Sequence, residues 1–138
     1  MLKLLIPILD RDGAPEAARH GAFLFAEYCV SEVEIVEVLD DVGDDRTAAF
    51  RSLAQLRLGE KHAMRDALLR TRAILDDAGV PYTWQRVFGR PERVIAACAE
   101  RGHADIVVID ASRLGFFRRW SVIARLRRLT HTPVTLLQ

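Results

Sequence analysis

The chain has 138 residues, of which 50% are apolar and 28% are charged, and its formal net charge is +1. A chain of this size can bury a hydrophobic core without disulfides, so we expect a single domain over residues 1–138 and exclude a disordered chain and a disulfide scaffold. No apolar run approaches the roughly 18 residues of a membrane span, and Met1 leads directly into a strand pattern. We therefore expect no transmembrane helix, no secretory signal and a cytoplasmic location.

Charge is distributed unevenly along the chain. Residues 1–50 carry eleven acidic and four basic side chains, whereas residues 111–138 carry six arginines and no acid. A run of like charge is usually a solvated face, and a surface for an anion or an acidic partner is the alternative. The arginines concerned are Arg113, Arg118, Arg119, Arg125, Arg127 and Arg128.

The first unit of the chain is a strand followed by a helix. Residues 2–9 are almost wholly apolar, which predicts a strand that is covered on both faces. A turn follows, in which Asp12 is a candidate N-cap and Pro15 suits the first turn of a helix. The residues expected on the buried side of this helix are Ala17, Gly21, Leu24, Phe25 and Tyr28.

The second unit has a more polar strand. In residues 32–39 apolar side chains alternate with glutamates, which predicts a strand with one wetter face, nearer an edge of the sheet. Residues 40–46 form an acidic loop, and residues 47–78 keep helical periodicity, with Gly59 as a candidate break. The inward residues of this helix are predicted to be Phe50, Leu53, Ala54, Met64, Leu68, Thr71, Leu75 and Ala78.

Three more strands and two more helices complete the pattern. Residues 82–88, 105–110 and 133–138 predict strands, and a helix runs from Pro91 to Gly102. The inward residues are predicted to be Val94, Ile95, Cys98 and Ala99 in that helix, and Val122, Ile123, Leu126 and Leu129 in the last helix. Alternating strands and helices predict an α/β fold with a doubly wound parallel sheet. Ligands of such sheets bind beyond the carboxyl ends of the strands, so the turns after Leu9 and Ile109 are the candidate sites.

Other chemistry receives little support from the sequence. Cys29 and Cys98 both fall in predicted helices and are expected to be buried, inert thiols. The four histidines are scattered, no His/Cys pair has zinc spacing, and no serine lies in a nucleophile-elbow motif. Asp10 and Asp110 follow adjacent strands and could share a cation or a proton, although two solvated acids are the commoner outcome. We therefore assign no catalytic residue and no metal ligand.

Two segments carry a family resemblance. VFGRPERVIAACAERGHADIVVI at residues 87–109 and RLTHTPVTLL at residues 128–137 resemble the universal stress protein family, and the five strand–helix units extend the likeness over the whole chain. The resemblance implies a five-stranded parallel sheet in the order 3-2-1-4-5, with helices on both faces. It also implies a homodimer and, in many members, an ATP site at the point where the strand order reverses.

The sequence departs from the family pattern at this ATP site. Members that hold ATP usually carry Gly-x-x-Gly, nine residues, and Gly-Ser or Gly-Thr, but here Asp110 and Arg113 stand at the first two glycine positions. Trp120 and Ser121 stand at the Gly-Ser pair, and the intervening segment is three residues shorter. Glycines let backbone N–H groups reach phosphate oxygens, whereas the Asp110 carboxylate repels them. We also expect Trp120 to add bulk at the turn where phosphate would lie, packed on Phe116 or Phe117.

The first turn leaves two alternatives open. Asp10 either corresponds to the family's aspartate one place late after Pro7, or Asp12 corresponds to it after a three-residue insertion. The arginines near the shortened loop could replace lost backbone donors for a smaller anion. The candidate ligand-binding residues are Asp10, Asp12, Asp110, Arg113, Arg119 and Ser121.

The resemblance and its departures together give a functional hypothesis. We expect a homodimeric stress-response or regulatory interaction module with an unidentified protein partner, no cofactor and no enzymatic activity, because the ATP motif is degraded. The alternative is an ATP-binding or other anion-binding switch, or a slow ATPase, in which Asp10 or Asp12 contacts the base or a metal and Ser121, Arg113 and Arg119 hold phosphates. Nucleic acid is disfavoured because the net charge is only +1 and the first half of the chain is acidic. The last strand leaves an open apolar edge, which predicts a dimer interface at Pro133, Val134, Thr135, Leu136 and Leu137.

Overall fold

The computed structural model describes residues 1–10, 12–39, 65–111 and 116–137, with side chains in the last range from residue 120 onward. Its centre is a parallel sheet of five strands in the order β3-β2-β1-β4-β5. The strands are β1 (Leu2–Ile8), β2 (Val30–Leu39), β3 (Tyr82–Phe88), β4 (Ile106–Asp110) and β5 (Val134–Leu137). The predicted fold class and strand order are therefore confirmed.

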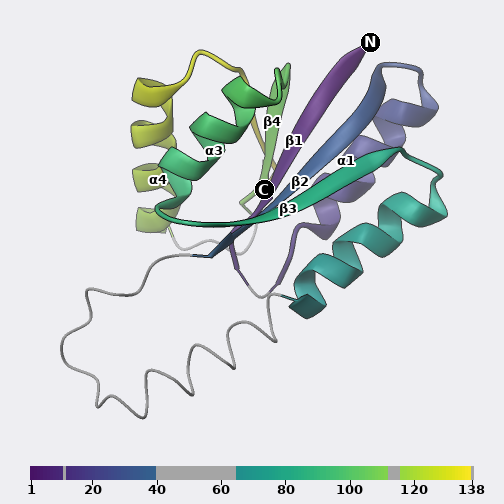
Figure 1. Ribbon diagram of the computed structural model, residues 1–138, viewed down its shortest axis with the longest axis horizontal. Helices are drawn as coiled ribbons and strands as arrows, with labels where there is room; N and C mark the ends of the chain where they lie inside the picture. The colour runs from purple at the N-terminus through teal and green to yellow at the C-terminus, as the bar shows by residue number, and fades with distance from the viewer. Residues whose placement is uncertain (11, 40–64, 112–115, 138) are drawn as a thin grey trace.

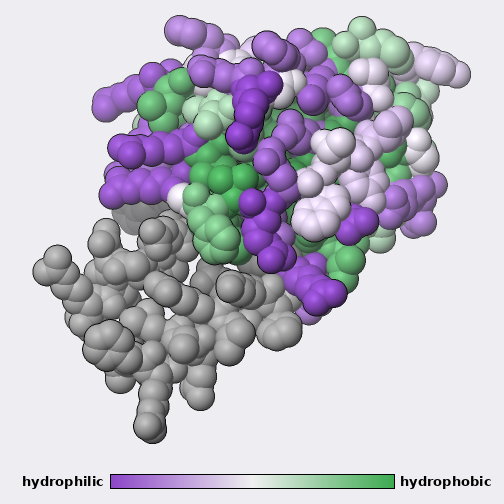
Figure 2. Space-filling view, in the orientation of Figure 1, coloured by the Kyte–Doolittle hydropathy of each residue, from purple (hydrophilic) through white to green (hydrophobic). Residues whose placement is uncertain are grey.

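Helices cover both faces of the sheet. α1 (Pro15–Ala26) and the helix of residues 65–77 lie on one face, and α3 (Pro91–Arg101) and α4 (Phe116–Leu129) lie on the other (Figure 1). Figure 1 looks along the sheet from the β3 side, with α3 and α4 at the left and the helix of residues 65–77 at the right. Figure 2 shows the same face, where polar side chains project from the helix layers and paler, less polar atoms lie along β3.

The core consists of two apolar layers that share β1. Leu4, Ile6 and Ile8 point into the layer under α1, and Leu5 points into the layer under α3 and α4. All four side chains are fully buried, as the apolar run of the first strand predicts. Each buried side chain of this size contributes about 1.5–3 kcal/mol relative to exposure, so β1 is a major source of the stability of the domain.

The glutamates of β2 differ from the prediction of a wetter face. Glu34 and Glu37 are buried, because β2 lies between β1 and β3 and its neighbours supply polar partners. Gln85 Nε2 donates a hydrogen bond of 2.7 Å to Glu34 Oε1, and Lys3 Nζ lies 3.9 Å from Glu34 Oε2. Glu32 is exposed, whereas Glu34 and Glu37 form polar pairs inside the sheet, so the glutamates of this strand do not share one wetter face.

The end of α1 also differs from the prediction. The helix stops at Ala26, and Tyr28 has a positive φ of 61° and is 82% exposed. Cys29 follows in the turn before β2 and is exposed, so the prediction that it is buried in a helix was wrong. The physical reason is that the chain must turn back to begin β2 at Val30, which carries both residues off the buried side of α1.

α3 agrees closely with its predicted pattern. It begins at Pro91, ends against Gly102, and buries Val94, Ile95, Cys98 and Ala99. Burial raises the pKa of the Cys98 thiol, although a hydrogen bond from Arg101 lowers it in part. The prediction that Cys98 is a buried thiol is confirmed.

The other two helices agree with their predicted buried sides in part. In α4, Val122 and Leu126 are buried as predicted, but Leu129 is exposed because it lies in the last turn, beyond the contact with the sheet. In the helix of residues 65–77, Leu68, Thr71 and Leu75 are buried as predicted, and Ala78 falls just after the helix. The predicted loop at 40–46 and the predicted helical residues Phe50, Leu53, Ala54, Gly59 and Met64 lie outside the described residues. None of the helices described here is long and apolar enough to span a bilayer.

Candidate functional site

The candidate site lies where the strand order reverses, between the carboxyl ends of β1 and β4. The chain leaves β1 toward α1 on one face of the sheet and leaves β4 toward α4 on the other. Leu5 of β1 is paired with Val107 of β4, and continuing this register places Asp110 beside Ile8. This is the position at which doubly wound sheets bind their ligands, as the sequence predicts.

A compact turn connects β1 to α1. The Asp12 N–H donates to Asp10 Oδ1 at 2.9 Å, and the Gly13 N–H donates to the Asp10 carbonyl oxygen at 3.2 Å. The Ala14 N–H donates to Thr71 Oγ1 at 3.2 Å, which ties the turn to the helix of residues 65–77. Asp10 therefore has a structural role as the acceptor that closes the turn.

Gly13 fits this turn for two separate reasons. Its φ is +75°, a conformation that glycine adopts without strain. A Cβ atom built on Gly13 would lie 3.0 Å from the Ala67 carbonyl oxygen and 3.1 Å from Thr71 Oγ1. The turn and the helix therefore approach each other too closely for a side chain at this position.

Asp110 caps α1 from a different strand. α1 begins at Pro15, and Ala14 before it has no side-chain acceptor, so the prediction that Asp12 caps this helix was wrong. Pro15 has no N–H, and the N–H of Glu16 donates to Asp110 Oδ2 at 3.2 Å. A side-chain acceptor at this place is worth about 0.5–2 kcal/mol. Asp110 therefore holds the end of β4 to the first turn of α1.

The contact between Asp110 and Glu16 lowers the expected affinity of the site for anions. The first turn of a helix carries a partial positive charge that attracts phosphate groups. Here the Asp110 carboxylate already lies against the first turn of α1. A phosphate about 4 Å from that carboxylate would be repelled by roughly 4 kcal/mol at an effective dielectric constant near 20. The described part of the site therefore disfavours a polyphosphate.

Of the predicted ligand residues in the segment after Asp110, the structure describes the side chain of Ser121 alone. Ser121 is exposed, and it lies inside α4 rather than at a turn, because the helix begins at Phe116. Trp120 is likewise in the helix and is 58% exposed, so the expectation that it blocks a turn was wrong. Arg113 lies outside the described residues, as do the side chain of Arg119 and the predicted packing of Trp120 on Phe116 or Phe117.

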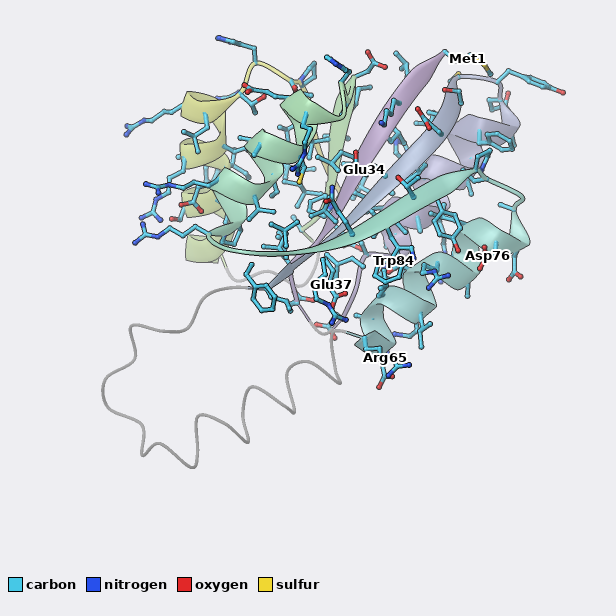
Figure 3. The ribbon with its side chains drawn as sticks, viewed as in Figure 1. Met1, Glu34, Glu37, Arg65, Asp76 and Trp84 are labelled. Carbon is cyan, nitrogen blue, oxygen red and sulfur yellow. The ribbon has the colours of Figure 1, made fainter. Side chains whose placement is uncertain are left out.

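A buried carboxylate near this site has no counterpart in the sequence-based prediction. Glu37 is fully buried two residues before the end of β2, opposite Ile8 of β1 (Figure 3). Arg86 Nε donates to Glu37 Oε2 at 3.3 Å, but Glu37 Oε1 has no hydrogen-bond partner among the residues that the structure describes. A buried polar atom without a partner is unfavourable, so this oxygen is an available acceptor for a donor group. The signal in the sequence is a glutamate near the carboxyl end of a strand, matched by an arginine in the next strand.

The described side chains do not form a metal site. Among residues 1–10, 12–39, 65–111 and 120–137, no three or more His, Cys, Asp or Glu side chains gather closely enough to hold an ion. Asp10 and Asp110 lie at the ends of neighbouring strands, but each accepts a backbone N–H from the β1–α1 region. Both acids therefore have roles in holding the turn and the helix.

The order of the sheet, the helix pair on each face and the reversal of the strand order between β1 and β4 define a doubly wound α/β fold. The model of the universal stress protein family matches residues 1–138. The chain therefore belongs to the universal stress protein family. No curated protein sequence matches the chain.

Solved structures of the family share this fold. A universal stress protein family member from Burkholderia pseudomallei is 20% identical, with a TM-score of 0.70 over 98% of this chain and 94% of that one. UspA from Lactobacillus plantarum is 18% identical, with a TM-score of 0.76 over 99% and 97% of the two chains. The Archaeoglobus fulgidus protein in complex with dAMP is 17% identical, with a TM-score of 0.66 over 100% and 98%. At these identities the likeness shows a common fold.

Proposed function

We propose that this chain is a stress-response regulatory module that acts in the cytoplasm through protein contacts, rather than as a catalyst, and that does not bind ATP in the usual manner of its family. The observation that carries this proposal is the hydrogen bond between Asp110 and the Glu16 N–H. The carboxylate takes the place of a family glycine and lies against the first turn of α1. It therefore adds negative charge where the family's nucleotide site would need bare backbone donors.

A second candidate function is a nucleotide-dependent switch. The Archaeoglobus fulgidus relative was solved in complex with dAMP, which carries a single phosphate. A monophosphate brings less negative charge toward Asp110 than a triphosphate does, so the repulsion is weaker. Oε1 of Glu37 lacks a hydrogen-bond donor within the described part of the chain, which favours this candidate, because the amino group of a nucleobase would supply one.

Release of bound nucleotide separates the two candidates. The purified protein is denatured without prior dialysis, and the supernatant is analysed by ion-pair chromatography against AMP, dAMP and ATP standards. If the chain is a regulatory module without a bound nucleotide, we expect no nucleotide to be released in an amount proportional to the protein. Release of ATP close to one equivalent per chain contradicts the proposal, and release of a monophosphate supports the switch.

The proposed module is a homodimer that pairs through β5. β5 lies at an edge of the sheet, with β4 as its neighbour, and all four of its side chains are half-buried. An edge strand with unpaired backbone groups and no charged side chain is suited to pairing with a second copy about a two-fold axis. The interface comprises Pro133, Val134, Thr135, Leu136 and Leu137.

Sedimentation velocity at micromolar concentration tests this pairing. The expected result is a species of twice the chain mass. Replacement of Val134 by proline is expected to shift it to a monomer, because the Val134 N–H points away from β4 and proline removes this donor. Proline at the exposed position Phe88, whose N–H points away from β2 in the opposite edge strand, is the matched control and leaves the dimer intact. A monomer at 10–50 μM for the unaltered chain would contradict the pairing.

A further inference from the structure

The sheet has a second edge, at β3, that differs from the one at β5. β3 has seven residues whereas β5 has four, and among the described strands β2 alone pairs with β3. Its register against β2 is unbroken from Tyr82 to Phe88, without a bulge that would twist the edge away. The longer of the two edge strands is therefore β3.

The backbone of every second β3 residue points away from the sheet. The Val33 N–H donates to the Pro81 carbonyl oxygen, and the Gly89 N–H donates to the Leu39 carbonyl oxygen. These two bonds fix the alternation, so the odd-numbered residues of β3 face β2. The N–H and C=O groups that point outward belong to Tyr82, Trp84, Arg86 and Phe88.

The side chains of the same four residues form an aromatic and cationic row. Trp84 is 46% exposed and Phe88 is 64% exposed, which is unusual for aromatic residues of a strand. The Arg72 guanidinium lies 5.4 Å from the centre of the Trp84 ring and 5.8 Å from that of Tyr82. Figure 3 shows Trp84 between β3 and the helix of residues 65–77, where this stacking fixes its position.

Arg86 places a cation between the two exposed rings. Its side chain is 38% exposed, and its Nε donates to the buried Glu37. Within the described residues no other hydrogen bond is made by this guanidinium, so its terminal nitrogens are available to an acceptor. Arg90, just beyond β3, is also exposed. The outer side of this row is therefore complementary to a carboxylate flanked by apolar side chains.

We propose that the β3 edge binds an extended segment of a partner protein by strand addition. In that segment, an acidic side chain lies opposite Arg86, and apolar side chains two residues before and after it lie opposite Trp84 and Phe88. A second copy of this chain is a poorer occupant, because pairing at both β3 and β5 would join copies into an open-ended chain. The proposal deepens the interaction role proposed above and names the chemistry of the partner.

A seven-residue peptide with this pattern is the probe. Its sequence is threonine-valine-threonine-glutamate-threonine-valine-threonine, and the matched control replaces glutamate with lysine. Amide exchange is followed residue by residue by NMR. We expect the acidic peptide to slow exchange at Trp84, Arg86 and Phe88 at least fivefold, while the amides of Gln85 and Val87, which already face β2, change little. The lysine peptide is expected to bind at least tenfold more weakly.

Two substitutions link the binding to this edge. Trp84→Ser is expected to weaken binding of the acidic peptide at least fivefold, whereas Leu69→Ser removes a comparably exposed side chain from the helix of residues 65–77 and leaves binding unchanged. Circular dichroism establishes that both variants are folded. Equal binding of the two peptides, or no protection at the three outward amides, would overturn the proposal. If these amides became protected without peptide as the protein concentration rises, the edge would bind a second copy of the chain. This result would also overturn the proposal.

Failure here is distinct from failure of the proposed function. The nucleotide-release and sedimentation measurements concern the ends of β1 and β4 and the opposite edge of the sheet. If the chain pairs through β5 and releases no nucleotide but does not bind the acidic peptide, the proposed function is supported and strand addition at β3 is contradicted.

Discussion

Asp110 Oδ2 lies 3.2 Å from the backbone nitrogen of Glu16, so the last residue of β4 caps a helix that begins 95 residues earlier at Pro15. The contact supplies an acceptor that Ala14, at the usual capping position, lacks. It also puts a negative charge against the first turn of α1. The Asp110 side chain therefore joins the end of β4 to the start of α1, and its charge is also the reason why we expect weak polyphosphate binding.

Asp110→Ala tests the capping role. The variant leaves the Glu16 N–H without its acceptor, and we expect the free energy of unfolding to fall by about 0.5–2 kcal/mol. Urea denaturation followed by circular dichroism measures the change. Glu100→Gln, which alters an exposed acid on α3, is the control and is expected to shift stability by less than about 0.5 kcal/mol. If the Asp110→Ala variant were as stable as the unaltered chain, the stabilising role of Asp110 as a helix cap would be contradicted.

Asp110→Asn separates the charge from the hydrogen bond. The amide oxygen of asparagine can still accept from the Glu16 N–H, so we expect most of the stability to remain. The negative charge is lost, and any affinity for inorganic phosphate or ATP is expected to rise at least threefold. Calorimetric titration of both proteins side by side measures this ratio. An unchanged affinity would mean that the carboxylate charge does not control anion binding.

Gly13 and Gly79 form a matched pair for testing the β1–α1 turn. Both have positive φ values, +75° and +71°, but only Gly13 has neighbours within 4 Å of a built Cβ atom. Gly79→Ala is expected to lose about 1–2 kcal/mol from backbone strain alone. Gly13→Ala is expected to lose at least about 1 kcal/mol more, because its Cβ would press on the Ala67 carbonyl oxygen. Equal losses in thermal or urea unfolding would show that the turn is not tightly packed on the helix.

Glu37 and Arg86 are predicted to be energetically coupled. Arg86→Leu leaves the buried Glu37 carboxylate without its partner, and we expect a loss of about 2–4 kcal/mol, below the fully buried limit because Arg86 is partly exposed. The double variant with Glu37→Leu is expected to be more stable than Arg86→Leu alone. A double-mutant cycle in urea gives the coupling energy. Additive effects of the two substitutions would contradict a direct interaction.

The two thiols are expected to react at very different rates. Cys29 is exposed, whereas Cys98 is buried and its pKa is raised by burial. A thiol reagent at pH 8 should therefore modify one cysteine rapidly and the second only on unfolding, and Cys29→Ser should abolish the fast phase. Because the raised pKa favours the protonated thiol in the fold, the stabilisation from Cys98 is present below the ordinary thiol pKa of 9.0 and is lost as the pH rises through the higher folded value.

The periodic parts of the fold could be predicted from sequence because their signals are local. The apolar run of β1 and the spacing of Val94, Ile95 and Cys98 in α3 identify buried sides without knowledge of their partners. Helix ends are less certain, because the turn that carries Tyr28 into a positive φ depends on where β2 must begin. Local patterns therefore predicted the elements and a parallel sheet, the family resemblance implied the strand order, and neither predicted the conformation of the residues between α1 and β2.

The position of the site could be predicted from the topology of the sheet, but the contacts between its residues could not be predicted from sequence. Glu34 and Glu37 are three residues apart and lie on opposite faces of β2, and their partners Gln85 and Arg86 lie about fifty residues away. Likewise, nothing local connects Asp110 with Glu16. Interactions between distant segments become visible only when the strand register brings the residues together.

Calorimetric titration of the unaltered protein with ATP and Mg²⁺ tests the central claim most directly. The Asp110 carboxylate at the first turn of α1 predicts no binding tighter than about 10 μM, which corresponds to roughly −7 kcal/mol. A dissociation constant well below 10 μM with one ATP per chain would contradict the account.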